Sequence, residues 1–226
     1  GADARRVVAQ MKEKLNTDAI MIQLPIGAGE TFAGVIDLIK MKAYNFDGRD
    51  GEFVKEVDIP ADMLEEAQES RGAMLEGLSM YSDEMMEKLL SEEEVSEELI
   101  HKVIRQATQQ QGMTPVLVGS AYKNKGVQLL LDSVERYLPS PLDREISAKK
   151  VGDETQKIVL KPDPNAPLVG MAFKIVEDPF GQLTFMRVYQ GKIEKGEMYV
   201  NQRTGRKERF SRIVRMHADK REEVDV

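Results

Sequence analysis

The segment Val118–Val134, which reads VGSAYKNKGVQLLLDSV, decides the fold class of this chain. An apolar strand runs into Gly119-Ser120-Ala121, and a short basic loop then leads into an amphipathic helix. A nucleotide base is often held at such a strand end in an α/β fold. The segment therefore predicts an α/β domain. The loop at Ser120-Ala121 either holds a base or is an ordinary strand-to-helix connection with Lys123 and Lys125 solvated, and the first interpretation raises the question of where phosphates would bind.

The residues around this segment predict a mixed domain of helices and strands. Asp3 precedes apolar residues at helical spacing, so we expect it to cap a helix that runs to Leu15. Pro25 and Gly27 close the next apolar run, and glycines and aspartates punctuate a small meander of strands. The expected strands lie at 19–24, within 31–46, at 53–59 and at 114–118, and the further helices lie at 63–78, 83–90, 97–110 and 126–138.

The last third of the chain predicts β structure after a linker. Residues 143–165 are charged and proline-bearing with little periodicity, as expected of a domain boundary. From Leu168 onward the pattern alternates as in strands, with glycines at the turns. We expect the first part of a β-barrel, with strands at 169–176, 183–189, 197–201 and 206–217.

Composition excludes several kinds of chemistry. The 226 residues are 41% hydrophobic, enough to bury real cores, and they include no cysteine, which excludes disulfides and thiolate catalysis. The two histidines, His101 and His217, cannot make a metal site by themselves. No apolar run approaches the roughly 18 residues of a spanning helix, and the N-terminus lacks a signal-peptide pattern. We therefore expect a cytoplasmic protein with no bound metal and no membrane partner.

One segment outweighs the whole net charge of −7. Residues 52–98 hold sixteen acidic side chains against three basic ones, a local balance of −13. One interpretation is a solvated helical face. The alternative is an electrostatic dock for a basic partner, because complementary fields raise association rate and specificity.

The sequence has no phosphate site. The run G-x-x-x-x-G-K-[ST] of a P-loop, whose backbone amides cradle phosphates, is missing. Gly27-Ala28-Gly29 is followed by Glu30, which would repel a phosphate, so we interpret this cluster as a turn. Asp178-Pro179-Phe180-Gly181 matches the D-x-x-G of a magnesium and γ-phosphate switch, but a hairpin turn explains it better. No nucleophile lies near the acidic pairs, so we predict no catalytic residue in this chain.

Three long segments in a fixed order resemble the translation elongation factor G family, the ribosomal translocase GTPases. They read IQLPIGAGETFAGVIDLIKMKA from Ile22, PVLVGSAYKNKGVQLLLDSVERYLPSPLD from Pro115 and RVYQGKIEKGEMYVNQRTGRKERFSRIVRMHADKREEV from Arg187. The resemblance implies a multidomain α/β plus β fold. The end of a P-loop GTPase domain would carry an inserted α+β subdomain, and part of a translation-factor β-barrel would follow.

The resemblance also answers the phosphate question. The chain starts like the segment that follows the family's guanine-specifying N-K-x-D motif, so the P-loop, both switches and N-K-x-D would lie upstream of residue 1. The resemblance implies that Ser120, Ala121 and Lys123 form the guanine side of the site, with a backbone amide contacting the guanine carbonyl oxygen. The intact protein would bind GTP or GDP with Mg²⁺, whereas we expect this fragment to bind no nucleotide measurably, because the phosphate contacts are missing.

The domains and partners follow from the same resemblance. A GTPase-domain helix would span 1–18, the inserted subdomain 19–111, the end of the GTPase domain 112–142, the linker 143–165 and the barrel 166–226. The insert would meet the ribosomal stalk protein, in agreement with its acidic helices, and the barrel would lean on the small ribosomal subunit.

A basic stripe in the barrel is a candidate for rRNA contact, with a solvated edge strand as the alternative. Strand alternation puts Lys207 and Arg209 on one face and Arg206 and Arg212 on the other, so neither face is simple core. The candidates are Arg203, Arg206, Lys207, Arg209, Arg212 and Arg215.

One departure concerns the subtype. Phe180-Gly181-Gln182-Leu183-Thr184 is one residue shorter than the common family form and lacks its arginine, and it resembles the mitochondrial type or divergent bacterial paralogues. The parent protein would then perform translocation with ribosome recycling, or translocation alone. Release-factor GTPases and ribosomal protection proteins share the domain order, and a ribosome-binding adaptor without a nucleotide site is a rival of another class.

Overall fold

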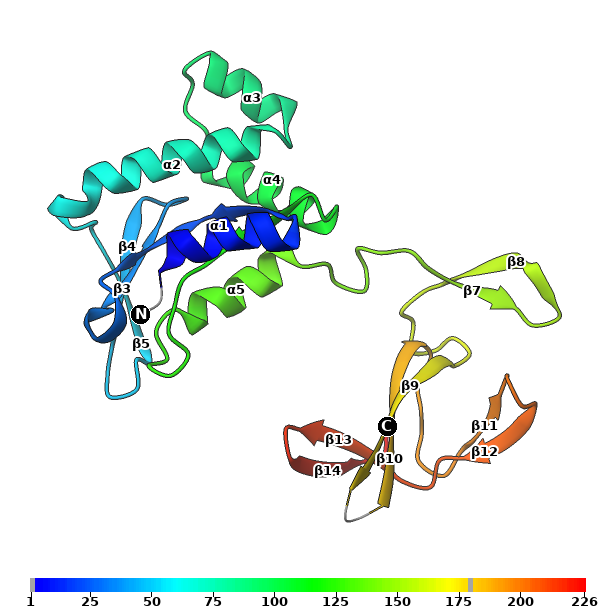
Figure 1. The fold of residues 1–226 in the computed structure, drawn as a ribbon. Helices are drawn as coiled ribbons and strands as arrows, with labels where there is room; N and C mark the ends of the chain where they lie inside the picture. The colour runs from blue at the N-terminus through cyan, green and yellow to red at the C-terminus, as the bar shows by residue number, and fades with distance from the viewer. Residues whose placement is uncertain (1–2, 179–180) are drawn as a thin grey trace. The chain divides into compact units, whose positions relative to one another are not determined.

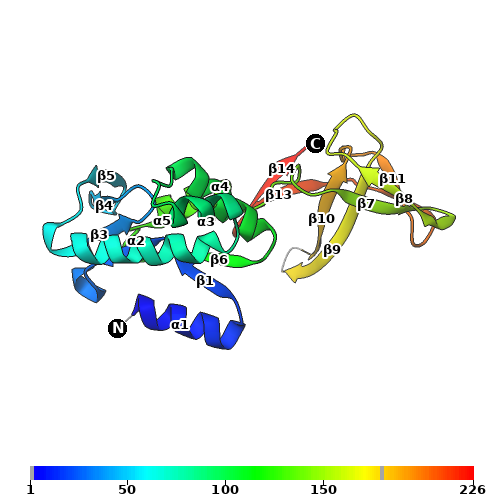
Figure 2. The same cartoon turned by 90° about the horizontal axis from the view of Figure 1, so that it is seen from above.

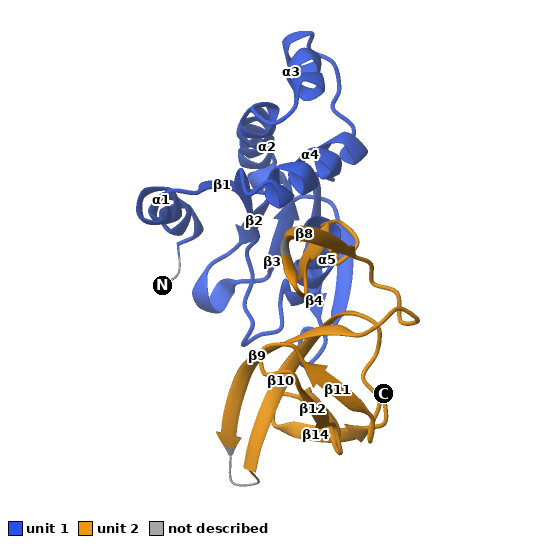
Figure 3. Ribbon diagram, turned by 90° about the vertical axis from the view of Figure 1, so that its right-hand side faces the viewer, with its two compact units in different colours: residues 1–138 blue, residues 139–226 orange. Residues whose placement is uncertain are grey.

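A computed structural model describes residues 3–178 and 181–226. The chain divides into two compact units, residues 1–138 and 139–226, coloured separately in Figure 3. The first unit mixes helices and strands, and the second is built of strands (Figure 1).

Helix α1 (Ala4–Leu15) begins where the sequence predicts. The Asp3 carboxylate accepts a hydrogen bond from the Arg6 amide at 3.0 Å, which confirms the N-cap. The helix ends at Asn16, which adopts the left-handed conformation with a φ of 48°.

The predicted strand at 19–24 is two strands that belong to different sheets. Strand β1 (Asp18–Met21) pairs in parallel with β6 (Met113–Val116), and β2 (Gln23–Ile26) pairs antiparallel with β3 (Gly34–Asp37). The change of partner falls at Ile22, whose amide donates to Val116 while its carbonyl accepts from Leu38. The proline in β2 is tolerated because β2 is the edge strand of its sheet.

The predicted meander is confirmed as a four-stranded antiparallel sheet in the order β2-β3-β4-β5, with β4 at Lys42–Asp47 and β5 at Phe53–Val57. Neighbouring residues on a strand face opposite sides, so Val35 and Tyr44 share one face and Ile36 and Ala43 the other. Both faces are buried. A short 3₁₀ turn, η1 (Gly29–Thr31), connects β2 to β3, and a second, η2 (Ala61–Met63), follows β5.

The three helices predicted after the meander are present as α2 (Leu64–Ser79), α3 (Asp83–Leu90) and α4 (Glu97–Gln109), which lie together in Figure 2. Serine hydroxyls cap two of them: Ser82 accepts from the Met85 amide and Ser96 from the Leu99 amide. Apolar residues of the helices pack with one face of the sheet into the main core, which includes Leu24, Ile36, Leu38, Met74, Leu78, Met85, Ile100, Val103 and Ile104.

The opposite face of the sheet forms a second core cluster with helix α5 (Val127–Tyr137). Phe32, Val35, Tyr44 and Phe46 are buried there, and Leu129 of α5 and Val118 pack against them. The sheet therefore contacts the segment that leads into the predicted base-binding loop.

The second unit consists, over its described residues, of antiparallel strand pairs. The expectation of a linker at 143–165 is wrong for most of that range, because β7 (Ile146–Lys150) and β8 (Asp153–Leu160) form a hairpin. Sequence patterning missed it because most of its described side chains are exposed and only Leu160 is buried, which leaves a weak apolar alternation.

The next hairpin joins β9 (Val169–Asp178) and β10 (Gly181–Gln190), as predicted. Pro179 and Phe180, on which the predicted turn depends, lie outside the described residues. The predicted strand at 206–217 divides into β12 (Arg206–Arg209), which pairs with β11 (Met198–Asn201), and β13 (Ile213–His217), which pairs with β14 (Lys220–Val224). The sequence did not predict β14.

Candidate functional site

A tight loop closes between β6 and α5. Ser120 and Lys125 exchange two backbone hydrogen bonds, at 2.8 and 3.0 Å, and the Asn124 amide donates to the Ala121 carbonyl at 3.1 Å. Asn124 has a φ of 49°, the left-handed conformation that asparagine tolerates better than most residues. We call residues Ser120–Lys125 the base loop.

Glycines on both sides of the base loop make this closure possible. A Cβ atom at Gly119 would stand 2.8 Å from the Lys125 carbonyl oxygen, and one at Gly126 would stand 2.8 Å from the Val118 oxygen. Gly126 also has a φ of 86°, which side chains rarely adopt. The two glycines that bound the pattern G-S-A-Y-K-N-K-G are therefore required by the backbone.

Ser120 and Ala121 form the first half of the base loop. The Ser120 hydroxyl accepts from the Lys123 amide at 3.4 Å, so it braces the turn. The Ala121 residue is exposed, and its N–H has no acceptor among the residues that the structure describes. An unpaired amide at a strand end can donate to a carbonyl oxygen of a planar ligand.

The Lys123 ammonium is hydrogen-bonded within the chain and is not a free cation. It donates to the carbonyl oxygens of Gly29 and Glu30 in η1, both at 3.0 Å. Lys125 extends to the Phe32 carbonyl at 3.4 Å. Both lysines therefore attach the base loop to the turn that precedes β3, and the role of Lys123 toward a base stays a prediction.

Two glutamines outside the predicted set support the loop. The buried Gln23 accepts from the Val118 amide through its side-chain oxygen at 3.3 Å. The Gln128 amide nitrogen donates to Gly51 at 3.1 Å and to Asn124 at 3.3 Å. Local sequence carries no signal for the contacts of Gln23 with Val118 and of Gln128 with Gly51, because these segments lie far apart in the chain. The polar Gln23 within an apolar run was the one feature of the sequence that could have indicated a buried, hydrogen-bonded side chain.

A hollow of about 370 Å³ opens between the base loop and the turn from β4 to β5. Tyr122, in this loop, is 100% exposed. The hollow is lined by Phe46, Gly48, Arg49, Asp50, Gly51, Tyr122, Lys123, Asn124 and Lys125.

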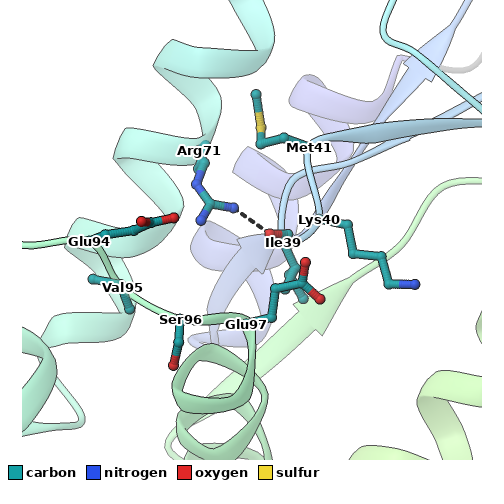
Figure 4. Close-up of a pocket in the computed structure, with 8 residues that line it drawn as sticks. All are labelled: Ile39, Lys40, Met41, Arg71, Glu94, Val95, Ser96 and Glu97. Atoms are coloured by element: carbon teal, nitrogen blue, oxygen red, sulfur yellow. Dashed lines mark hydrogen bonds between the residues drawn. The ribbon is translucent and has the colours of Figure 1, made fainter.

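A second hollow, of about 270 Å³, lies between α2, the turn after β3 and the segment before α4 (Figure 4). The Arg71 guanidinium points to the turn and donates to the Leu38 and Ile39 carbonyls. Asp37 accepts from the Ile39 and Lys40 amides, and burial raises the pKa of this carboxyl. These groups are committed to holding the turn, so we assign the hollow a structural role.

A part-buried polar contact joins α4 to α5. His101 Nδ1 lies 2.7 Å from the Tyr137 hydroxyl, and His101 Nε2 lies 3.0 Å from Arg136 Nη1. Because arginine can only donate, the neutral ring carries its proton on Nδ1 and donates to Tyr137. Burial, and then the nearby charges of Arg136 and Lys40, lower the pKa of His101 to about 4.

The six basic candidates of the second unit do not form one uniform stripe. Arg203 lies in the β11–β12 turn, and Arg206 and Lys207 begin β12; the side chains of these three residues make no hydrogen bond or ion pair within the described ranges. The other three have partners or acidic neighbours: Arg209 donates to the Gly196 carbonyl, Arg212 pairs with Glu223 at 2.7 Å, and Arg215 stands opposite Glu222. The Asn201 side chain donates a hydrogen bond to the Glu208 carboxylate, and Asn201 lies opposite Arg206 in the strand pair. Glu208 and Arg206 therefore lie on the same face of the hairpin.

The acidic side chains of the segment 52–98 are exposed. All sixteen carboxylates between Glu52 and Glu98 are on the surface. A few have cationic neighbours, such as Glu66 with Arg5 and Glu84 with Lys102. Within residues 3–178 and 181–226, no cluster of three or more histidine or carboxylate side chains could hold a metal ion, and no helix is long and apolar enough to cross a membrane.

Comparison with known proteins finds a family match in the last part of the chain and a solved structure that aligns with all of it. The family described as Elongation factor Tu domain 2 matches residues 181–226. A crystal structure of a protein from Thermus thermophilus aligns with 100% of this chain and 31% of its own, with a TM-score of 0.73 and 26% identity.

Curated relatives match from end to end of the chain. Elongation factor G of Rhodopirellula baltica is 64% identical over 225 residues, and elongation factor G 1 of Desulfotalea psychrophila is 46% identical over 226 residues. Each match covers 100% of this chain and 32% of the relative, so the chain spans about a third of the length of these proteins. The chain belongs to the elongation factor G family and corresponds to about a third of the length of these relatives.

Proposed function

We propose that this chain is part of a GTPase that moves tRNA and mRNA through the ribosome during protein synthesis. The observation that supports this most directly is the 64% identity to an elongation factor G along the whole chain. In this proposal residues 1–18 and 112–142 end the GTPase domain, 19–111 are inserted into it, and 166–226 begin a β-barrel.

The base loop supplies the guanine side of the nucleotide site in this proposal. The exposed Ala121 amide, which has no acceptor among the described residues, fits the carbonyl oxygen of guanine, and Ser120 holds the turn that presents it. GTP or GDP with Mg²⁺ would bind here when the phosphate-binding segments are also present, and the Mg²⁺ would neutralise phosphate charge. The 226-residue chain by itself should not bind GTP measurably; tight binding in an equilibrium titration would contradict this.

The ribosome is the proposed partner, in the cytoplasm. The exposed carboxylates of the inserted segment suit a basic partner, which we propose to be the ribosomal stalk protein. The unpaired cations Arg203, Arg206 and Lys207 suit rRNA phosphates of the small subunit. The short sequence at positions 180–184 leaves two proposals for the subtype, a translocase that also recycles ribosomes and one that does not.

The test uses the complete gene product that contains this chain. We expect ribosomes to stimulate its GTP hydrolysis, and we expect mRNA to advance by one codon in a reconstituted complex. Hydrolysis with release of peptide, or with displacement of a bound antibiotic, would favour the release-factor or protection type. Ribosome binding without hydrolysis, by a gene product no larger than about the 25.5 kDa of this chain, would favour the adaptor.

A further inference from the structure

The side chain of Gln128 bridges two segments that are far apart in the sequence. Its amide nitrogen donates to the Gly51 carbonyl in the β4–β5 turn and to the Asn124 carbonyl in the base loop, at 3.1 and 3.3 Å. One carboxamide therefore fixes the distance between the turn and the loop. The side-chain oxygen of Gln128 is buried and has no hydrogen-bond partner among the described atoms. The two hydrogen bonds of the amide nitrogen are therefore made at the cost of an unsatisfied acceptor.

Because Gly51 has no side chain, the backbone of the β4–β5 turn can approach the backbone of the base loop. Gly51 is buried, with a φ of 65°, and a Cβ atom there would stand 2.7 Å from the Lys123 oxygen and 2.9 Å from the Asn124 oxygen. Any side chain at this position would push against the backbone of the base loop, which cannot rotate away as a side chain can. The turn thus abuts the base loop directly.

A second contact restrains the same loop. The Lys123 ammonium is held by the Gly29 and Glu30 carbonyls, and Lys125 extends to Phe32. Residues 29–32 and the turn at Gly51 both belong to the inserted segment. The loop is therefore restrained by that segment as well as by β6 and α5.

We infer that Gly51 and Gln128 are positioning residues for guanine recognition: they hold the base loop so that the Ala121 N–H is aimed at the base. This inference rests on the proposed function of the base loop. Neither residue touches the nucleotide in this inference. Both act through the backbone of Lys123 and Asn124, which lie within three residues of Ala121.

The test measures nucleotide affinity in the complete protein with two probes, GDP and 6-thio-GDP. The second probe replaces the guanine carbonyl oxygen by sulfur, a weaker acceptor, so the ratio of the two Kd values reports the Ala121 contact. We expect Gly51→Ala and Gln128→Met each to weaken GDP binding by about tenfold. In both variants the ratio of the 6-thio-GDP Kd to the GDP Kd should fall toward one.

Matched controls separate positioning from general damage. Gly48→Ala changes another glycine of the same turn with positive φ, where the new Cβ would meet the Glu52 side chain and not the base loop. Asp132→Asn changes an exposed residue of α5 one turn after Gln128. Both controls should retain the affinity and the ratio of the unsubstituted protein.

The outcomes are distinct. If the unsubstituted protein binds no GDP, the proposed function fails. If it binds GDP and discriminates against 6-thio-GDP, but Gly51→Ala and Gln128→Met keep the same ratio, the proposed function stands and the positioning role is overturned. Equal loss of affinity for both probes, with a lowered Tm, would also overturn it, because it would indicate a purely structural role.

Discussion

The His101 imidazole on α4 donates a hydrogen bond from Nδ1 to the Tyr137 hydroxyl on α5, with 2.7 Å between the two atoms. Tyr137 is buried, and burial raises its pKa to about 12, so its hydroxyl stays protonated across the physiological range. Arg136 faces the other ring nitrogen. The contact therefore depends on a neutral histidine.

This contact predicts how stability varies with pH. The pKa of His101 is about 4 in the folded chain against 6.5 in the unfolded chain, so between these values the unfolded state binds more protons. The contribution is fully present above pH 6.5 and is lost as the pH falls toward 4. Urea denaturation at several pH values should show this loss, and His101→Gln should reduce it. An unchanged slope in that variant would mean that other groups carry the dependence.

Arg71 predicts a stability effect without any change in the base loop. Its guanidinium donates to the Leu38 and Ile39 carbonyls, so Arg71→Met leaves these part-buried acceptors without it. We expect the free energy of unfolding to fall by about 1–3 kcal/mol in a denaturant titration. Lys55→Met, which removes an exposed ion pair with Asp47, serves as the control and should cost clearly less. Equal costs for the two variants would argue against a structural role for Arg71.

The main core predicts a larger cost. Leu78 of α2 is 0% exposed and belongs to the cluster that joins the helices to the sheet. Leu78→Ala should lower the free energy of unfolding by about 2–5 kcal/mol, because it removes buried methyl groups and leaves a cavity. Leu131→Ala on α5, where the side chain is 63% exposed, should change it by less than about 0.5 kcal/mol in the isolated chain.

The basic residues of the second unit predict a salt-dependent effect. Arg206 and Lys207 have unpaired side chains among the described residues, so charge reversal of either in the complete protein should weaken ribosome binding more at low salt than at high salt. The salt dependence of log Kd should decrease by a slope of about one for each lost phosphate contact. Arg212→Gln is the matched control, because Arg212 is already paired with Glu223. Equal loss at all salt concentrations would indicate folding damage instead.

The acidic helices predict an effect on association rate. Glu69 and Glu76 lie exposed on α2, and replacing both by glutamine in the complete protein should slow its association with the stalk protein while changing dissociation little. Stopped-flow mixing at low and high salt measures both rates. An association rate that the two substitutions leave unchanged would indicate that the acidic residues only keep the helical surface solvated.

The sequence by itself determined the elements whose signals are local. Helical periodicity placed α3 and α4 within one residue of their observed bounds, because this signal acts within a few turns of the helix itself. The pattern G-S-A-Y-K-N-K-G likewise determined the closed base loop, since its two glycines are required by backbone contacts a few residues apart.

Tertiary structure decided which segments meet. The partner change at Ile22, the attachment of Lys123 to Gly29 across 94 residues and the contact of Gly51 with the base loop all depend on long-range packing. It also decided which basic side chains remain unpaired, because Arg212 has an acidic partner on β14, whereas Arg206 makes no such pair among the described residues. Local propensity carries no information on these choices, since each is set by the burial and hydrogen bonding of groups that are remote in the sequence.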